Sequence, residues 1–419
     1  MKKSIILVSQ SYLHFASESV LSYLKENIDV ILIIHESEEV HPHIKNHITR
    51  LYKVSGSFEN SLRPVLDFDE VSHILAAEIK RAGSVNDLAI FCQQEDNVLL
   101  AAELRAKFNI AGDRPEIICQ FRDKIEMKKA VNAIFPQALP KFERLDIESI
   151  KNDAVTYYHE LVAKLGSKLI IKPTSGAGSF NVKIVDSVDD LCTAVDMINH
   201  DEHVFDYEVD EFISGKMYQC DSFIRNGKVV FSGILELGCT NFDFVLGKPL
   251  SVYPVSSHEL YNKLFAFNQN IITTLGFSDG STHHELFVKD SGEIIFLEIA
   301  ARVPGGIGVP YHTKNSNINL IDANLLLSAD SPALADIKPE VKNNVVSALL
   351  PVGHGKVLSL NQPDIESVYH IDWHITVGQD VDSRSLIDTA GILTFVNDDS
   401  VVLRRDFEKL QAWIPAVCG

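Results

Sequence analysis

A lysine at the end of an apolar run precedes a glycine-rich loop near the middle of the chain. The segment IIKPTSGAGSFNVKIV spans residues 170–185 and places Lys172 just before the loop Thr174–Ser179, which has two glycines and three hydroxyl side chains. Backbone N–H groups of such a loop reach phosphate oxygens while the ammonium group neutralises their charge. No Walker A motif is present, because no Gly-Lys pair is followed by Ser or Thr. A phosphate-binding loop and an ordinary glycine hairpin both remain open.

Two glutamates lie inside apolar, strand-like runs further along the chain. Glu285 occurs in THHELFV and Glu298 in IIFLEIAARVPGG, and the turn signal at residues 290–292 separates the runs. Neighbouring strands would project both carboxylates into one space, where they need a cation. Such oxygen ligands suit Mg²⁺, which bridges carboxylates and substrate phosphates. The alternative is that each glutamate faces solvent on an edge strand.

Arg302 follows the second glutamate and precedes Gly305-Gly306. Its guanidinium could hold an anionic intermediate beside the metal. His283 and His284 flank Glu285, but a histidine pair without spaced partners is more often structural than metal-ligating.

A large globular chain has to position these groups. With 419 residues, and about 150 residues per domain, we expect about three domains. The sequence is 46% hydrophobic and 23% charged, close to the average of globular proteins, which argues against disorder, collagen-like repeats and coiled coil. Its formal charge of -19 disfavours nucleic acid and membrane partners, although a few basic side chains in a cleft would still bind a compact polyanion.

The order of apolar runs predicts the elements. A strand at Ser4–Val8, a helix at Ser17–Asn27 and a strand at Val30–Ile34 predict a small parallel sheet with helices on both faces. From about residue 115 a helix and strand pairs predict a mainly antiparallel region, including a strand over residues 204–214. The C-terminal part is expected to contain strands at Val345–Leu350, Ala390–Val396 and Val401–Leu403, then a helix at Phe407–Trp413.

The cysteines and the lengths of the apolar runs indicate the cellular compartment of the protein. The six cysteines include no CxxC pair, which favours a reducing cytoplasm over a disulfide scaffold or a zinc knuckle. The apolar run Ser4–Val8 is too short for a signal peptide, and no segment approaches the ~18 apolar residues of a membrane helix.

Five motifs in order resemble the ATP-grasp carboxylate-amine ligases, and among them the L-amino acid ligases and the biotin-carboxylase-like group. The motifs are RDK (122–124), IIKPTSGAGS (170–179), VDEFISG (209–215), HHELF (283–287) and LEIAARVPGG (297–306). The resemblance covers nearly the whole chain. It implies an α/β and α+β multidomain fold: a Rossmann-like N-terminal (pre-ATP-grasp) domain at 1–114, an ATP-grasp domain at 115–325 with a flap subdomain at about 136–205, and a small β-rich C-terminal domain at 326–419.

The resemblance also implies roles for single residues. Lys124 and Lys172 match the lysines that contact the nucleotide, and the loop with Thr174, Ser175, Gly176, Gly178 and Ser179 matches the flap over the phosphates of ATP. Asp210, Glu211 and Ile213 match the segment whose backbone contacts adenine. Glu285 and Glu298 match the ligands of Mg²⁺, for which Mn²⁺ is an alternative, and Arg302 matches the catalytic arginine.

The chain departs from this family at two positions. Met217 stands where many members have a glutamate that binds ribose, and Ala300 stands where many have an asparagine ligand of a second Mg²⁺. Because of these departures, a non-catalytic nucleotide-binding regulatory protein stays an alternative.

By the resemblance, the expected activity is amide or peptide bond formation through an acylphosphate, with ATP converted to ADP and phosphate. The expected partners are a small-molecule carboxylate, an amine with one amino acid among the substrates, and a second copy in a homodimer. A purine-pathway or carboxylase-like enzyme is the alternative within the same superfamily. Residues 238–253 and 304–312 are expected to line the substrate pocket.

Overall fold

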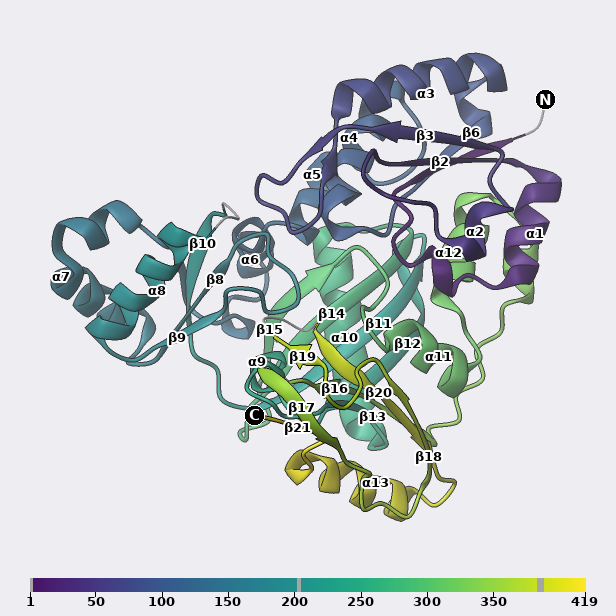
Figure 1. Cartoon of the computed structure of the whole chain (residues 1–419). Helices are drawn as coiled ribbons and strands as arrows, with labels where there is room; N and C mark the ends of the chain where they lie inside the picture. Colours follow the sequence, from purple (N-terminus) through teal and green to yellow (C-terminus); the bar gives the residue numbers. More distant parts are fainter. Residues whose placement is uncertain (1–2, 202–204, 383–387) are drawn as a thin grey trace.

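The N-terminal region is built on a parallel β-sheet (Figure 1). The computed structural model describes residues 3–201, 205–382 and 388–419. Four parallel strands run in the order β3 (Arg50–Val54), β2 (Asp29–His35), β1 (Ser4–Val8) and β6 (Leu88–Phe91). Alternate side chains of β1 enter two apolar clusters, which also take side chains from α1 (Glu18–Asn27), α3 (Phe68–Ala82) and α4 (Val98–Phe108). A parallel sheet buried on both faces is therefore confirmed.

The glycine-rich loop connects two strands of a second four-stranded sheet. Its strands run in the order β7 (Phe142–Arg144), β10 (Tyr207–Glu211), β8 (Leu169–Pro173) and β9 (Lys183–Val185), all antiparallel. The helices α7 (Ile147–Leu165) and α8 (Val188–His200) share one apolar cluster with this sheet and form the lobe at the left of Figure 1. β10 is shorter than the strand expected over residues 204–214, of which Val204 lies outside the described residues.

The largest sheet has eight antiparallel strands and carries both glutamates. In order these are β15 (Ile294–Ala300), β14 (Gly280–Val288), β11 (Lys216–Arg225), β12 (Lys228–Leu237), β13 (Leu250–Pro254), β16 (Val345–Pro351), β20 (Thr389–Val396) and β18 (Val368–Trp373). The helix α10 (His258–Leu275) packs on the face of Cys220, and α11 (Gly308–Ser316) packs on the face of Met217. The two helices therefore cover opposite faces, because adjacent residues of a strand alternate.

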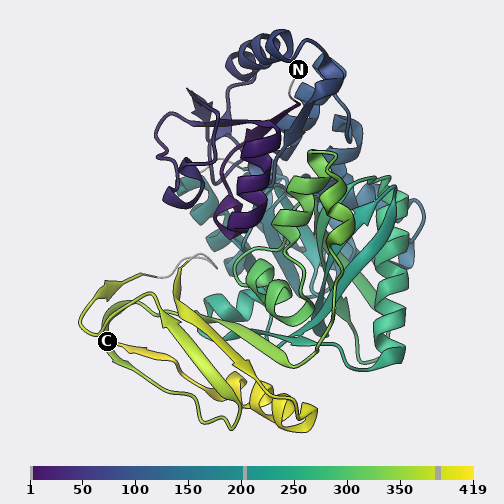
Figure 2. The same ribbon diagram turned by 90° about the vertical axis from the view of Figure 1, so that its right-hand side faces the viewer.

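The C-terminal strands partly continue this sheet and partly form their own. β16, β20 and β18 extend the large sheet across residue 326, while β19 (Asp380–Val381), β17 (Gly355–Leu360) and β21 (Ala416–Cys418) make a separate three-stranded sheet (Figure 2). The division into three domains thus stays a prediction.

The strand expected at Val401–Leu403 is wrong. These residues lie in the helix α13 (Ser400–Lys409). Asp399 precedes the helix as its N-cap and its side chain accepts hydrogen bonds from the N–H groups of Val401 and Val402. Leu403, Phe407 and Leu410 are buried at helical spacing, so capping and amphipathic packing outweigh the strand preference of two valines. The helix expected at Phe407–Trp413 begins earlier and ends in a short 3₁₀ turn at Leu410–Ala412.

Within the described ranges, no helix is both long and apolar enough to cross a membrane. All six cysteines are described and all are free thiols.

Candidate functional site

Four charged side chains form a buried cluster where α6 (Lys124–Asn132) meets β8 and β10. Lys172, at the end of β8, lies 3.0 Å from Asp210 and 3.5 Å from Glu208. Lys128 of α6 lies 2.9 Å from Glu208 and 2.5 Å from Asp210. Two ammonium groups thus face two carboxylates, and their mutual attraction offsets the desolvation penalty of burying the charges.

This cluster keeps Lys172 cationic. Burial by itself lowers the pKa of Lys172, but Asp210 and Glu208 outweigh burial and raise that pKa above its usual value. Burial likewise raises the pKa of Asp210, but Lys128 and Lys172 outweigh it and lower that pKa. The lysine expected to contact phosphate is therefore a fixed positive charge.

Sequence reasoning missed Lys128 and Glu208, which are both fully buried. A signal for each was present. Lys128 stands four residues after Lys124 on one helix face, and Glu208 stands two residues before Asp210 on one strand face.

The first half of the glycine-rich loop is held in place by the residues before and in α6. The N–H of Lys124 donates to Thr174 O at 2.9 Å, and its Nζ donates to Gly176 O at 2.7 Å. Arg122 also donates to the carbonyl oxygen of Ser175. In the second half, Gly178 and Ser179 both have positive φ, at 63° and 56°. The loop is therefore tied to α6 at one end and turns sharply at the other.

Glu285 and Glu298 occupy directly opposite positions on β14 and β15. Lys124 lies 3.1 Å from Glu298 Oε2. Asn241 donates to Glu285 Oε1 at 2.9 Å, and His283 Nε2 lies 3.3 Å from the same oxygen. Asn241 comes from the stretch 238–253 that we expected at the pocket.

Burial and neighbouring charges shift the pKa values of Glu298 and of the two histidines beside Glu285. Burial raises the pKa of Glu298, but Lys124 and Lys172 outweigh it and lower that pKa. The pKa of His283 would fall through burial, but Asp221 and Glu285 raise it to about 9. His284 instead points into the opposite face, 2.8 Å from Asn268, and burial followed by the nearby charge of His283 lowers its pKa to about 3.

The donor set fits one Mg²⁺. Like charges directly opposite each other across two strands are destabilising without a cation, and both are hard carboxylate oxygens. In the described part of the chain, no cluster of three or more His, Cys, Asp or Glu side chains could hold a metal ion. A site with two carboxylates matches the way Mg²⁺ binds through one or two carboxylates plus substrate phosphates.

Arg302 lies beside the N-terminal region. Its Nε donates to Glu95 Oε2 at 2.6 Å, and its Nη1 donates to Val303 O at 2.9 Å. Burial raises the pKa of Glu95, but Arg302 and Arg122 outweigh burial and lower it to about 2. Arg122 lies 4.0 Å from Glu95 Oε1 and 2.5 Å from Asp96 Oδ1. A short chain of contacts therefore runs from Arg302 through Glu95 and Arg122 to the loop carbonyl of Ser175.

The residues expected near adenine lie at and just beyond the end of β10. The Asp210 side chain belongs to the buried cluster, whereas Glu211 Oε2 accepts a hydrogen bond from Lys141 N at 3.2 Å and Ile213 is half-buried. Met217 is buried in an apolar cluster with Phe287 and Leu297. Its side chain packs rather than offering a hydrogen bond to a ribose.

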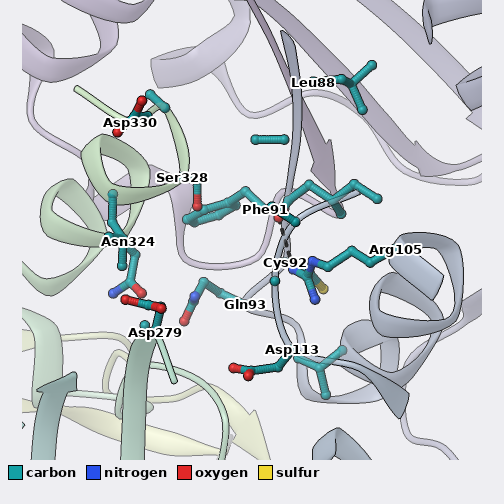
Figure 3. Close-up of a pocket in the computed structure, with 18 of the residues that line it drawn as sticks. Leu88, Phe91, Cys92, Gln93, Arg105, Asp113, Asp279, Asn324, Ser328 and Asp330 are labelled. Carbon is teal, nitrogen blue, oxygen red and sulfur yellow. Dashed lines mark hydrogen bonds between the residues drawn. The ribbon is translucent and has the colours of Figure 1, made fainter. Parts of the chain in front are cut away.

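The structure thus brings Lys124, the loop, Lys172, Asp210 and Glu298 into one contact network, which Glu95 and Arg122 extend to Arg302. A cavity of about 450 Å³ lies elsewhere, between β6, α4, β14 and α12 (Leu320–Ser328) (Figure 3). Its wall includes Arg105, Asp113 and Asn324, and Gln93 on that wall accepts a hydrogen bond from Val303 N at 2.8 Å. None of the site residues predicted from the sequence lines this cavity.

Comparisons with known proteins relate the central part of the chain to a known domain family. Residues 165–311 match the family described as the ATP-grasp domain. The chain is 23% identical over 287 residues to an L-arginine-specific L-amino acid ligase of Bacillus subtilis, covering 68% of this chain and 67% of the relative.

Two solved structures share the fold. An L-amino acid ligase from Bacillus licheniformis superimposes with a TM-score of 0.72 at 13% identity, covering 100% of this chain and 99% of that chain. An N5-carboxyaminoimidazole synthetase from Staphylococcus aureus, complexed with ADP, superimposes with a TM-score of 0.66 at 14% identity over 98% of each chain. The mixed helix and sheet fold expected from the sequence is therefore the ATP-grasp fold.

Proposed function

We propose that this protein, whose residues 165–311 are an ATP-grasp domain, is a cytoplasmic ATP-dependent ligase that joins a carboxylate to an amine, with an amino acid among its substrates. The observation that carries the proposal is the cross-strand pair Glu285 and Glu298 beside Lys124. Such a pair suits the terminal phosphates of ATP with one Mg²⁺, or Mn²⁺ in its place. The ATP-grasp ligases among its relatives support carbon-nitrogen ligation.

The proposed reaction has two steps. A substrate carboxylate oxygen attacks the γ-phosphorus of ATP, so that an oxygen-phosphorus bond forms and the bond to ADP breaks. The amine then attacks the acyl carbon, the carbon-nitrogen bond forms, and phosphate leaves with the carbon-oxygen electron pair while the amine loses a proton. The bound metal ion would spread the charge of the transferring phosphoryl group.

The protein's own groups bind and orient. Lys172 and Lys124 neutralise phosphate charge, and the N–H groups of the loop 174–179 donate to the phosphates. Arg302, fixed by Glu95, stabilises the negative oxygen that develops at the acyl carbon. Because water hydrolyses an acylphosphate, closure of the loop would protect the intermediate.

The turn after β1, in the N-terminal region, is a candidate wall of a substrate pocket beside Arg302. Ser9 and Tyr12, in the turn after β1, have positive φ of 73° and 67° although neither is glycine. Such strained backbone clusters at ligand sites. The hydroxyl of Tyr12 lies close to Gly305, in the predicted segment 304–312. We place the carboxylate substrate between this turn and Arg302.

The test is the fate of ¹⁸O placed in the substrate carboxylate. An acylphosphate route transfers one labelled oxygen to inorganic phosphate and yields ADP, with turnover requiring carboxylate and amine together. Label in AMP, with pyrophosphate as co-product, would replace this route by adenylation. ATP turnover that depends on bicarbonate instead of an amine would favour the carboxylase-like alternative, and nucleotide binding without turnover across amino acid mixtures would favour the regulatory one.

The proposed homodimer is supported by the resemblance to the biotin-carboxylase group. Analytical sedimentation at micromolar concentration measures the mass of the particle in solution. A mass of 46.6 kDa, that of one chain, would reject the dimer.

A further inference from the structure

A row of polar side chains crosses one face of the large sheet behind the two glutamates. Asp221 on β11 lies opposite His283 on β14, and His283 Nδ1 is 2.6 Å from Asp221 Oδ1. His312 on α11 contacts the other carboxylate oxygen through Nε2 at 2.7 Å. Asp221 and His312 are completely buried. The row therefore links the strand of Glu285 to the helix that follows the Arg302–Gly306 segment.

Asp221 lies at the centre of this row, and its carboxylate accepts the hydrogen bonds of its neighbours. Besides the two histidines, Gln219 Nε2 donates to Asp221 Oδ2 at 2.8 Å. An ionised carboxylate only accepts hydrogen bonds, so each imidazole presents an N–H to it. An asparagine at this position would point its own N–H₂ group at donors that are already there, and would bury an unsatisfied group.

Gly233, which has no side chain, leaves the space on the sheet that the His312 ring occupies. Gly233 lies opposite Asp221 on β12. A Cβ at Gly233 would be 2.1 Å from His312 Cε1, closer than any real contact. The glycine is therefore required for the helix α11 to place His312 against the carboxylate.

The other end of the row reaches Glu285. His283 Nε2 and Asn241 Nδ2 both contact Oε1 of Glu285. The two ring nitrogens of His283 therefore bridge Asp221 and Glu285, with Nδ1 on the aspartate and Nε2 on the glutamate. Among the hydrogen bonds of the described residues, none reaches Glu285 Oε2, which leaves that oxygen for a cation.

We propose that Asp221 is a positioning residue for the metal-site carboxylate: it fixes His283, which turns Glu285 so that Oε2 faces the ion, and it holds α11 through His312. This inference rests on the proposed function, because it assumes the ion at Glu285 and Glu298. Groups that orient metal ligands typically change metal affinity about 10- to 100-fold when mutated.

The test measures metal affinity rather than turnover. The full chain with ADP is titrated with Mn²⁺, and free Mn²⁺ is read by electron paramagnetic resonance. Asp221→Asn should weaken Mn²⁺ binding about tenfold or more while ADP affinity without metal stays the same. If wild type shows no ADP-dependent Mn²⁺ binding, the proposed metal site fails. If wild type binds and Asp221→Asn binds equally well, the positioning inference is overturned.

If Asp221→Asn does not fold, substitutions at His283 test the same positioning role. His283→Asn keeps a donor toward Asp221 but does not reach Glu285, so Mn²⁺ affinity should fall about tenfold. His283→Gln places an N–H near the lost Nε2 and should restore part of that affinity. His284→Asn is the matched control, because His284 is the next residue but faces the opposite side of the sheet. Equal Mn²⁺ affinity for wild type and His283→Asn contradicts the inference, as does an equal loss in His284→Asn.

Discussion

Glu285 and Glu298 are direct cross-strand partners, placed opposite each other by the antiparallel pairing of β14 and β15. The register shifts immediately after this pair, between Glu285 and Leu286. Two like charges at such a position repel each other unless a cation or an ammonium group lies nearby. Lys124 supplies one positive charge next to Glu298, and the remaining charge is available to a metal ion with nucleotide phosphates.

Replacing Glu298 by glutamine should abolish ligase turnover and leave the apo fold intact, because the change removes an anionic ligand without changing volume. The apo protein should keep its melting temperature, since one repulsion disappears together with the ion pair to Lys124. Stabilisation by Mg²⁺ with ADP should be lost, whereas in wild type ligand at about 100 times its Kd adds about 2.7 kcal/mol. Thermal shift with and without Mg²⁺-ADP measures this, and normal turnover in the variant would return Glu298 to a structural role.

Lys128→Met should lower the free energy of unfolding by roughly 3–5 kcal/mol, because Lys172 alone would then face the buried carboxylates of Glu208 and Asp210. Urea unfolding measures the change. Lys129→Met is the control: its side chain is 61% exposed and, among the described residues, its one ion pair is with Glu126, so the loss should be about 0.5 kcal/mol or less. Equal losses in both variants would show that the buried cluster contributes no more than a surface pair.

Glu95→Gln should lower kcat about 10- to 100-fold with little change in the KM for ATP. The charge-assisted hydrogen bond that orients Arg302 is worth about 1.5–3 kcal/mol, and its loss should act on the developing negative charge. Steady-state kinetics with both substrates separates the two parameters. A rise in the KM for ATP at constant kcat would mean that Glu95 acts on nucleotide binding instead.

Amide exchange should differ between the two halves of the glycine-rich loop. The N–H of Thr174 donates to Asp206 O at 2.8 Å, so the amide of Thr174 should be protected in the empty protein, while residues 177–179 should exchange faster. A non-hydrolysable ATP analogue with Mg²⁺ should slow the second half about 10- to 100-fold, since each hydrogen bond to a charged oxygen is worth roughly 1.5–3 kcal/mol. The hairpin at residues 225–228 serves as control, and unchanged exchange at 177–179 would place the phosphates elsewhere.

Acid should destabilise the fold partly through His284. Burial, followed by the charge of His283, lowers the pKa of His284 to about 3 in the folded protein, against about 6.5 when unfolded. Between these two pKa values the unfolded state binds more protons than the folded state. The neutral His284 therefore costs no folding stability above about pH 6.5, and as the pH falls below that value the free energy of unfolding decreases by at most ~1.4 kcal/mol per pH unit. The pH dependence of unfolding should be shallower in His284→Asn, and identical slopes would argue against a neutral buried imidazole.

The sequence alone determined the local features. Runs rich in β-branched residues predicted β1 and β2, because four or five consecutive apolar residues bounded by polar ones need burial on both faces. The lysine and glycine pattern indicated the loop after β8, and the hairpin signal after Glu285 predicted that Glu285 and Glu298 lie on neighbouring strands. Each of these inferences uses residues close together in the chain. The error at Val401–Leu403 arose where a three-residue run favours a strand and only the cap and the packing of the following residues decide for a helix.

The charged residues that share a site are far apart in the sequence and could be identified only from their contacts in the folded chain. Lys128 and Asp210 are 82 residues apart, Asp221 and His312 are 91 apart, and Glu95 and Arg302 are 207 apart. No periodicity joins such pairs, since the two partners lie on different elements or segments, as Lys128 on α6 and Asp210 on β10 do, and meet only when these pack together. A buried charge must find its counter-charge in three dimensions, so the roles of Lys128, Glu95 and Asp221 could not be predicted from spacing.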